Sequence, residues 1–448
     1  MATINLKGCI KSKYSIVHLL VILFGISAWI GVNGIFVQLP ILVHSSPEGS
    51  ALPTYVVIAI QMANVGPIIY TLLQQRQYKI NESLCILGIL TLGNISMALL
   101  VFFYDRTIIL SNSKYSVALL ILTFFTALVG CFSSVLFMPY LRNFDQTYII
   151  SYFIGEGLSG VLPSSVALIQ SVGGNTEYTT DDNQNDTSKK ITLNLRFSPP
   201  YYFLFIFITL FLSLNAFIIL QYSSFVQNIK TTSKEKEKQT TYYNVHEQSV
   251  SASNSLYKEN KQEMKQVVTD VTTKEIDPKC GHKISFYKRS YLLILMSFFC
   301  FFGNGFLPSI QLYSCLPYGD ITYQLSITLV QFANPIACFI AFWIMPLNLN
   351  IINLLSTLTL IFCTYVTYVA LISPFVPLRE SEIGVIIILL SWTILIGLIS
   401  YMKLVIVSIF RQIKKTNILL YIGIVMQAGS ASGAIISFIL IKFTNLFQ

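Results

Sequence analysis

Neutral amide side chains interrupt the apolar segments of this chain, and they are the residue type best placed to bind a ligand there. They are Asn33, Gln38, Gln61, Asn64, Asn304, Gln311, Gln331, Asn334 and Gln427. A carboxamide donates and accepts hydrogen bonds without carrying charge, and a neighbouring aromatic ring can stack on a flat molecule. Trp29 precedes Asn33 by four residues, so both fall on one helical face. The set suits a flat, neutral, hydrogen-bonding ligand.

Each of these amides, considered alone, could instead have a purely structural role. Asn and Gln join membrane helices through hydrogen bonds worth about 0.6 to 2 kcal/mol. Gln61 and Asn64 are three residues apart, and so are Gln331 and Asn334, so each pair shares a helical face. The residues expected to bind a ligand are Trp29, Asn33, Gln38, Gln61, Asn64, Asn304, Gln311 and Asn334.

The polar positions recur along the chain at an interval of about 270 residues. Asn33-Gly34 returns as Asn304-Gly305, Gln61-x-Ala63-Asn64 as Gln331-x-Ala333-Asn334, and Glu156-x3-Gly160 as Gln427-x5-Gly433. One such echo could arise by chance, but three in register predict two related halves. Doubled membrane halves with polar groups near the midplane are typical of secondary transporters, which bind their substrate at the repeat interface and work by alternating access.

Two charged residues lie within apolar segments and suggest a gate. Glu156 and Lys403 belong to different predicted halves at similar depths, about 10 Å from the predicted inner surface. Charges at such depths are costly and usually functional. We therefore expect a gating or coupling pair. The alternatives are that Lys403 extends to the cytosolic surface and that Glu156 is a protonated carboxyl bonded to a nearby carbonyl.

The elements that must position these residues are membrane helices. The chain is 54% hydrophobic and 11% charged, which is typical of an integral membrane protein. Eleven apolar stretches are long enough to cross a bilayer: 15–43, 54–74, 83–103, 115–139, 149–171, 199–221, 290–312, 321–346, 350–372, 383–409 and 416–443. We expect an all-α fold of eleven transmembrane helices.

The eleven predicted helices divide into halves of six and five. The expected domains are an N-terminal half at 1–221, a disordered cytosolic linker at 222–287 and a C-terminal half at 288–448. The linker is predicted from its mixed charge and its many Ser, Thr, Asn and Gln residues.

The positive charges orient the chain. With a cytosolic N-terminus, 21 of the 29 Lys and Arg residues fall on the cytosolic side, as the positive-inside rule requires. An odd number of helices then places the C-terminus outside. The polar loop at 172–197 is also placed outside, where we expect little regular structure, and Asn185 in its Asn-Asp-Thr sequon is the predicted glycosylation site.

Several function classes lack their signatures in this sequence. We find no GxxxxGK(S/T), HExxH or GxSxG motif, no acidic metal cluster and no metal-ligand spacing among the cysteines. We therefore expect no enzyme activity, no ATP use, no metal and no cofactor. The net charge of +9 is explained by the inner loops, so we expect no nucleic-acid partner.

The residues quoted above lie within longer motifs that resemble one family. The segment Trp29-Ile-Gly-Val-Asn33-Gly34-Ile-Phe36-Val-Gln38-Leu39-Pro40 resembles the first helix of the eukaryotic riboflavin transporters of the solute carrier class. Further motifs are similar to family segments in the same order: Pro47-Glu48-Gly49, Gln61-x-Ala63-Asn64-x-Gly66-Pro67, Gly155-Glu156-Gly157-Leu158-Ser159-Gly160, Leu307-Pro308-Ser309-x-Gln311-x-Tyr313-Ser314-Cys315-Leu316, Asn334-Pro335 and Ser400-Tyr401-x-Lys403.

The resemblance implies sodium-independent uptake of riboflavin (vitamin B2) at the plasma membrane. It also implies a major-facilitator-like fold similar to that of the equilibrative nucleoside transporters. Two positions depart from the family: Gln38 stands where members have Glu, and Phe36 stands where Trp is common. Proton coupling at position 38 therefore stays open, whereas recognition is compatible with Gln because it keeps one acceptor and adds a donor.

Two other functions remain as alternatives. A nucleoside or nucleobase transporter of the same fold would also take flat, neutral ligands. A receptor or scaffold would bind a ligand without moving it. Phosphorylated substrates such as flavin mononucleotide are disfavoured because the sequence shows no Arg cluster.

Overall fold

The structure is a computed structural model of a helical membrane protein. It describes residues 15–76, 81–110, 113–141, 144, 146–171, 176–179, 190–193, 195–227, 286–344, 348–411, 418–444 and 446–447. Within these residues nine helices are long and apolar enough to cross a membrane, and the number rises to eleven if each of two bent helix pairs is one span. The prediction of a mostly helical, multi-pass membrane protein is confirmed.

The N-terminal bundle is built from the residues up to 227. Its helical elements are Ser15–Ile26, α2 (Ile30–Ser45), η1 (Gly49–Ala51), α3 (Leu52–Ala63), α4 (Val65–Gln75), α5 (Glu82–Phe103), α6 (Val117–Phe132), η2 (Ser133–Phe137), α7 (Met138–Leu141), α8 (Gln146–Ser171) and α9 (Pro199–Tyr222).

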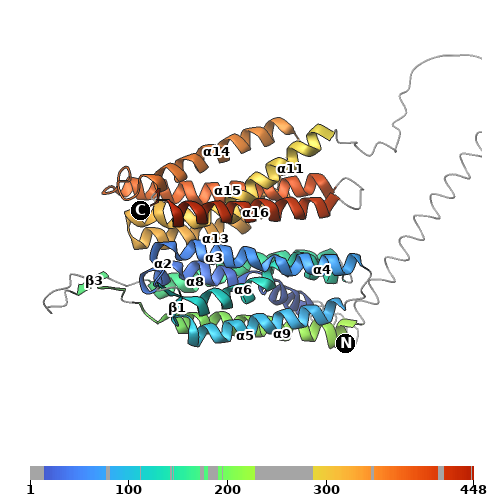
Figure 1. The fold of residues 1–448 in the computed structure, drawn as a ribbon. Helices are drawn as coiled ribbons and strands as arrows, with labels where there is room; N and C mark the ends of the chain where they lie inside the picture. Colours follow the sequence, from blue (N-terminus) through green and yellow to red (C-terminus); the bar gives the residue numbers. More distant parts are fainter. Residues whose placement is uncertain are drawn as a thin grey trace, which may run out of the picture.

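The C-terminal bundle lies beside the first, as Figure 1 shows. Its elements are α11 (Phe286–Cys300), η3 (Phe301–Phe306), α12 (Leu307–Cys315), η4 (Leu316–Tyr318), α13 (Asp320–Trp343), α14 (Leu349–Leu371), α15 (Glu382–Arg411) and α16 (Ile418–Phe443). Helices α2, α3 and α8 of the first bundle pack against α12, α13 and α16 of the second. The predicted linker at 222–287 lies almost entirely outside the described residues.

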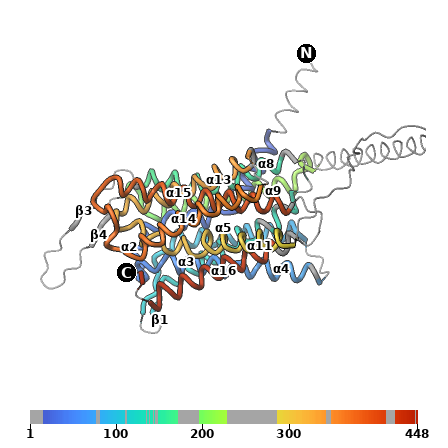
Figure 2. The backbone as a smooth tube through the Cα atoms, turned by 90° about the horizontal axis from the view of Figure 1, so that it is seen from above, coloured from blue at the N-terminus to red at the C-terminus, as the bar shows by residue number. Residues whose placement is uncertain are grey.

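Two short hairpins mark one end of the molecule, which we call the hairpin end (Figures 1 and 2). Strand β1 (Ile108–Leu110) pairs antiparallel with β2 (Ser113–Tyr115), and β3 (Thr176–Thr179) pairs with β4 (Lys190–Leu193). The expectation of little regular structure at 172–197 was wrong for β3 and β4, because the polar residues there satisfy their backbone groups by pairing. The predicted glycosylation site, Asn185, lies outside the described residues.

The first span is bent by 50° between Ile26 and Ile30. At the bend, the Ser27 hydroxyl donates to the Phe24 carbonyl, and Trp29 has non-helical dihedral angles at the start of α2. A hydroxyl that bonds a carbonyl of the preceding turn competes with the helical ladder, which favours a bend. Trp29 therefore caps α2 instead of belonging to its regular part, although its carbonyl oxygen still accepts from the Asn33 N–H at 2.9 Å.

The span Phe286–Tyr318 is interrupted by the π-helical segment η3, which contains Gly303, Asn304 and Gly305. A π-helical turn is wider than an α-helical one and is frequent at functional sites. The predicted span was therefore correct in position but not in regularity.

In each bundle, glycines let the first span cross a later helix closely, α8 in the N-terminal bundle and α16 in the C-terminal bundle. A Cβ atom on Gly155 of α8 would lie 2.1 Å from the Ile22 carbonyl oxygen. In the C-terminal bundle, a Cβ on Gly433 of α16 would lie 2.2 Å from the Phe301 carbonyl oxygen. Both contacts involve backbone atoms, so only glycine fits at these crossings.

Gly433→Ala is expected to destabilise the protein by about 1 to 3 kcal/mol, because the added methyl group must push two backbones apart. Gly423→Ala is the matched control, since Gly423 lies on the same helix and a Cβ there meets nothing within 4 Å. Thermal unfolding of the purified protein in detergent compares the two variants. Equal unfolding temperatures for Gly433→Ala and Gly423→Ala would contradict the close crossing.

Candidate binding site

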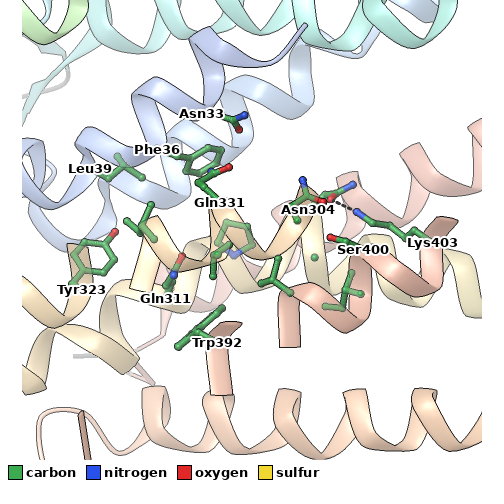
Figure 3. Close-up of a pocket in the computed structure, with 17 residues that line it drawn as sticks. Asn33, Phe36, Leu39, Asn304, Gln311, Tyr323, Gln331, Trp392, Ser400 and Lys403 are labelled. Atoms are coloured by element: carbon green, nitrogen blue, oxygen red, sulfur yellow. Dashed lines mark hydrogen bonds between the residues drawn. The ribbon is translucent and has the colours of Figure 1, made fainter. Parts of the chain in front are cut away.

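A cavity of about 170 Å³ lies between the two bundles. The N-terminal bundle contributes Asn33, Phe36 and Leu39 from α2, and the C-terminal bundle contributes η3, α12, α13 and α15. Figure 3 shows these side chains converging from helices of both bundles. A cavity between repeats is where a transporter fold is expected to bind its substrate.

Helices α13 and α15 line the cavity with faces of identical spacing. The lining residues are Tyr323, Ile327, Val330, Gln331 and Asn334 on α13, and Trp392, Ile396, Ile399, Ser400 and Lys403 on α15. In both helices the intervals from the first residue are four, seven, eight and eleven, which is one face of an α-helix over three turns.

One end of the cavity is aromatic and buried. Tyr323 and Trp392 are each 1% exposed, and both lie in the first half of their helices, toward the hairpin end. The Trp392 indole nitrogen donates to the Ser314 hydroxyl at 2.9 Å, which fixes the ring plane. This end offers rings for stacking on a flat ligand.

The other end of the cavity is polar and more accessible. Gln331, Asn334, Ser400 and Lys403 lie there, about three helical turns from the aromatic end, and Asn334 is exposed. The cavity therefore has an apolar end and a polar end, and its polar end points away from the hairpin end.

The two repeated asparagines make equivalent hydrogen bonds. Asn33 Nδ2 donates to Ser159 Oγ at 3.3 Å, and Asn304 Nδ2 donates to Ser430 Oγ at 3.1 Å. Each serine hydroxyl in turn donates to a carbonyl of the preceding turn of its own helix. The amide oxygens are thereby turned away from these serines.

The structure brings four of the eight predicted binding residues to the cavity: Asn33, Asn304, Gln311 and Asn334. Gln311 is held by its amide nitrogen, which donates to Ser326 Oγ at 3.1 Å. Gln331, which the sequence analysis noted among the amides, also lines the cavity.

The other four predicted residues lie outside the cavity lining. Gln61 donates to the Asn304 carbonyl oxygen at 3.1 Å and accepts a hydrogen bond from Asn64 at 3.0 Å. Gln38 is buried and donates to Gln170. The Trp29 ring packs beside Gly130 on α6. In this structure these four side chains support helices that form or flank the cavity.

The two predicted gating residues take different positions. Lys403 lines the cavity, and its ammonium donates to Asn304 Oδ1 at 3.1 Å. Glu156 lies on α8, outside the lining and directly before Gly157, where an added Cβ would lie 3.0 Å from the Pro335 side chain of α13. Pro335 follows Asn334, which lines the cavity together with Lys403, so Glu156 of one bundle and Lys403 of the other lie close to the same stretch of α13.

Sequence reasoning missed Trp392, Tyr323 and Phe36 as lining residues. For Trp392 a signal was present, because it precedes Lys403 by eleven residues and therefore shares its helical face. Tyr323 precedes Asn334 by the same interval. Extending each helical face by three turns from its polar residue, Lys403 or Asn334, would have identified both rings.

The arrangement can bind a flat, uncharged ligand by stacking and by neutral hydrogen bonds. The described residues contain no group of three or more His, Cys, Asp or Glu side chains that could hold a metal ion. A helical membrane protein with a cavity between two bundles has the architecture of a secondary transporter.

The fold agrees with that class. It is similar to the nucleoside transporter NupG, with a TM-score of 0.52 and 10% identity over 96% of this chain and 90% of that one. It is also similar to a POT family transporter, with a TM-score of 0.53 and 11% identity over 94% and 90% of the two chains. At these identities the likeness concerns the fold alone.

Sequence comparison gives the family. The model of solute carrier family 52, riboflavin transporter, matches residues 13–448. Member 3-A of that family from Danio rerio is 33% identical over 444 residues, covering 96% of this chain and 97% of the relative. Human member 3 is 31% identical over 475 residues, covering 97% of each chain. The chain belongs to the solute carrier family 52 riboflavin transporters.

Proposed function

We propose that this protein carries riboflavin into cells. The observation that carries the proposal is the cavity between the bundles, with buried rings at one end and amides at the other, in a chain of the riboflavin transporter family. The isoalloxazine ring of riboflavin is flat and has amide-like edges, and its ribityl chain carries hydroxyls. Such a ligand needs stacking and many neutral hydrogen bonds.

A nucleoside carrier is the second candidate, because the fold resembles that of NupG and nucleosides are also flat and neutral. The family match favours riboflavin. Phosphorylated flavins are disfavoured because Lys403 is the one cationic side chain in the cavity lining that the structure describes, whereas phosphate sites usually combine several donors with an Arg. A receptor that does not transport is the third candidate, and net flux would exclude it.

The finer topology belongs to the same proposal. We propose eleven spans divided six and five, a cytosolic N-terminus, an extracellular C-terminus, a plasma-membrane location and a glycan on Asn185. In this orientation the hairpin end faces outward. The bent pairs support the count of eleven, and the distribution of Lys and Arg supports the orientation. Sodium independence is proposed from family resemblance.

Contacts between the bundles support alternating access. Near the hairpin end, His44 of α2 meets Asp320 of α13 at 2.9 Å, and Gln324 donates to the Ala167 carbonyl oxygen at 3.2 Å. The Tyr55 and Phe438 rings form an edge contact between α3 and α16. With the outer side joined in this way and Asn334 exposed on the other side, the cavity is directed inward.

Cells with low native riboflavin uptake, expressing this protein, are expected to accumulate labelled riboflavin. Excess lumiflavin, which keeps the ring system, should inhibit this uptake, and excess uridine should not. Uridine transport without riboflavin transport would replace the proposal with the nucleoside alternative.

Variants of the same protein provide the matched control. Asn33→Ala should raise the apparent KM roughly five- to a hundredfold through the loss of one buried hydrogen bond. Asn215→Ala removes an amide from α9, away from the cavity, and should leave KM unchanged. Surface expression is measured for both variants.

We further propose that Glu156 and Lys403 couple the two bundles. They belong to different bundles and approach the same part of α13, Glu156 through its neighbour Gly157 beside Pro335 and Lys403 beside Asn334 in the cavity lining. Lys403 has a neutral partner, Asn304, in this structure. A rocking motion of the bundles could exchange that partner for Glu156. The ion pair would then form in one state of the transport cycle and break in the other.

Glu156→Gln and Lys403→Met are each expected to impair riboflavin uptake, because each leaves the other charge without compensation in a poorly solvated place. The double variant should recover part of the lost rate. Uptake rates normalised to surface expression are compared for the four proteins. Strictly additive losses in the double variant would exclude the pair.

A further inference from the structure

Among the described residues that line the cavity, Lys403 alone carries a formal charge. None of the other lining residues is ionisable at neutral pH, so the ammonium has no carboxylate within the cavity wall. Its hydrogen bond to Asn304 Oδ1 at 3.1 Å uses one of its three N–H groups. A cation left with unused donors inside a membrane protein usually has a functional partner.

The position of the ammonium is set by a chain of hydrogen bonds. Ser430 Oγ accepts from Asn304 Nδ2 at 3.1 Å and donates to the Met426 carbonyl oxygen at 2.9 Å. This chain keeps the Asn304 oxygen, rather than its nitrogen, directed at Lys403. The N-terminal bundle has the same asparagine–serine pair at Asn33 and Ser159, but position 132, which corresponds to 403 at the repeat interval of 271, is Phe. The positive charge of Lys403 therefore has no counterpart at the equivalent position of the N-terminal bundle.

The two ends of the cavity orient a flavin. The apolar dimethylbenzene end of the ring fits the buried rings of Trp392 and Tyr323. Lys403 lies eleven residues beyond Trp392 on α15, about 16 Å along the helix axis, where the pyrimidine end of a ligand and its ribityl chain would reach. Figure 3 shows Lys403 and Tyr323 toward opposite sides of the cavity.

The ribityl chain decides which edge of the ring meets the ammonium. It is attached to N10, on the same edge as N1 and the C2 carbonyl, and its hydroxyls suit the accessible polar end at Asn334 and Ser400. The opposite edge carries N5 and the C4 carbonyl. With the hydroxyls at the polar end, the N1–C2 edge is the one turned toward Lys403.

We infer that Lys403 is a specificity-determining residue that donates to the N1–C2 carbonyl edge of the flavin. This inference rests on the proposed function. In the occupied cavity the ammonium donates to an acceptor on the ligand. Ligand binding and the proposed pairing with Glu156 would then compete for the Lys403 side chain.

Two riboflavin analogues test the inference on the purified, full-length protein. In 1-deazariboflavin a C–H group replaces the acceptor N1, and in 5-deazariboflavin a C–H group replaces N5 on the other edge. The wild-type protein should bind 1-deazariboflavin roughly ten- to a hundredfold more weakly than 5-deazariboflavin, because an acceptor for a charged donor is lost. Binding is measured by competition with riboflavin, whose fluorescence reports its own binding.

The variants decide whether Lys403 is the donor. Lys403→Met should abolish the preference between the two analogues, and Lys403→Arg should retain it. Lys442→Met, which removes an exposed cation on α16, should leave the preference unchanged. Because the readout is a ratio of two affinities within one protein, a general loss of folded protein does not mimic the result.

Three results would overturn the inference: equal affinities for both analogues in the wild-type protein, weaker binding of 5-deazariboflavin, or a preference that survives in Lys403→Met. Failure of the wild-type protein to bind or take up riboflavin is a separate result, which refutes the proposed function and this inference with it.

Discussion

The structure depends on one constraint: polar side chains within membrane spans must find their hydrogen-bond partners inside the protein. The asparagine–serine bonds of the two bundles satisfy it in the same way. Asn33 with Ser159 joins α2 to α8, and Asn304 with Ser430 joins η3 to α16, and both pairs are offset by 271 residues. Close glycine crossings beside them bring the helices near enough for these short side chains to meet. The cavity lies between these two anchored crossings.

The two bundles contribute unequally to the lining of the cavity. Most of the lining comes from the C-terminal bundle, including Lys403 and the buried Trp392. In the N-terminal bundle the position equivalent to Lys403 is Phe132, whose ring packs against Tyr70. One bundle therefore supplies most of the binding surface, while α2 of the other closes it. An asymmetric ligand such as a flavin has one preferred orientation in such a site.

Helical class, the approximate spans and the repeat could be predicted from the sequence, because apolar length and repeated polar positions are local signals. Asn33 and Asn304 were predicted at the site for the same reason. Helical spacing gives the face of a residue but neither the tilt nor the bend of its helix. The first span bends by 50° just before α2, where the Trp29 ring packs beside Gly130 instead of lining the cavity, and Gln61 reaches the Asn304 backbone instead of the cavity. The first outcome depends on a contact between helices of one bundle and the second on a contact between bundles, and no single segment encodes either.

The central claim is that the bundles must separate at the hairpin end for the cavity to face outward. Cysteines introduced at His44 and Asp320, on opposite bundles, can be bridged by a short, reducible bifunctional thiol reagent. Bridging should stop riboflavin uptake, reduction should restore it, and each single-cysteine variant treated in the same way should keep its activity. Undiminished uptake by fully bridged protein would contradict the account.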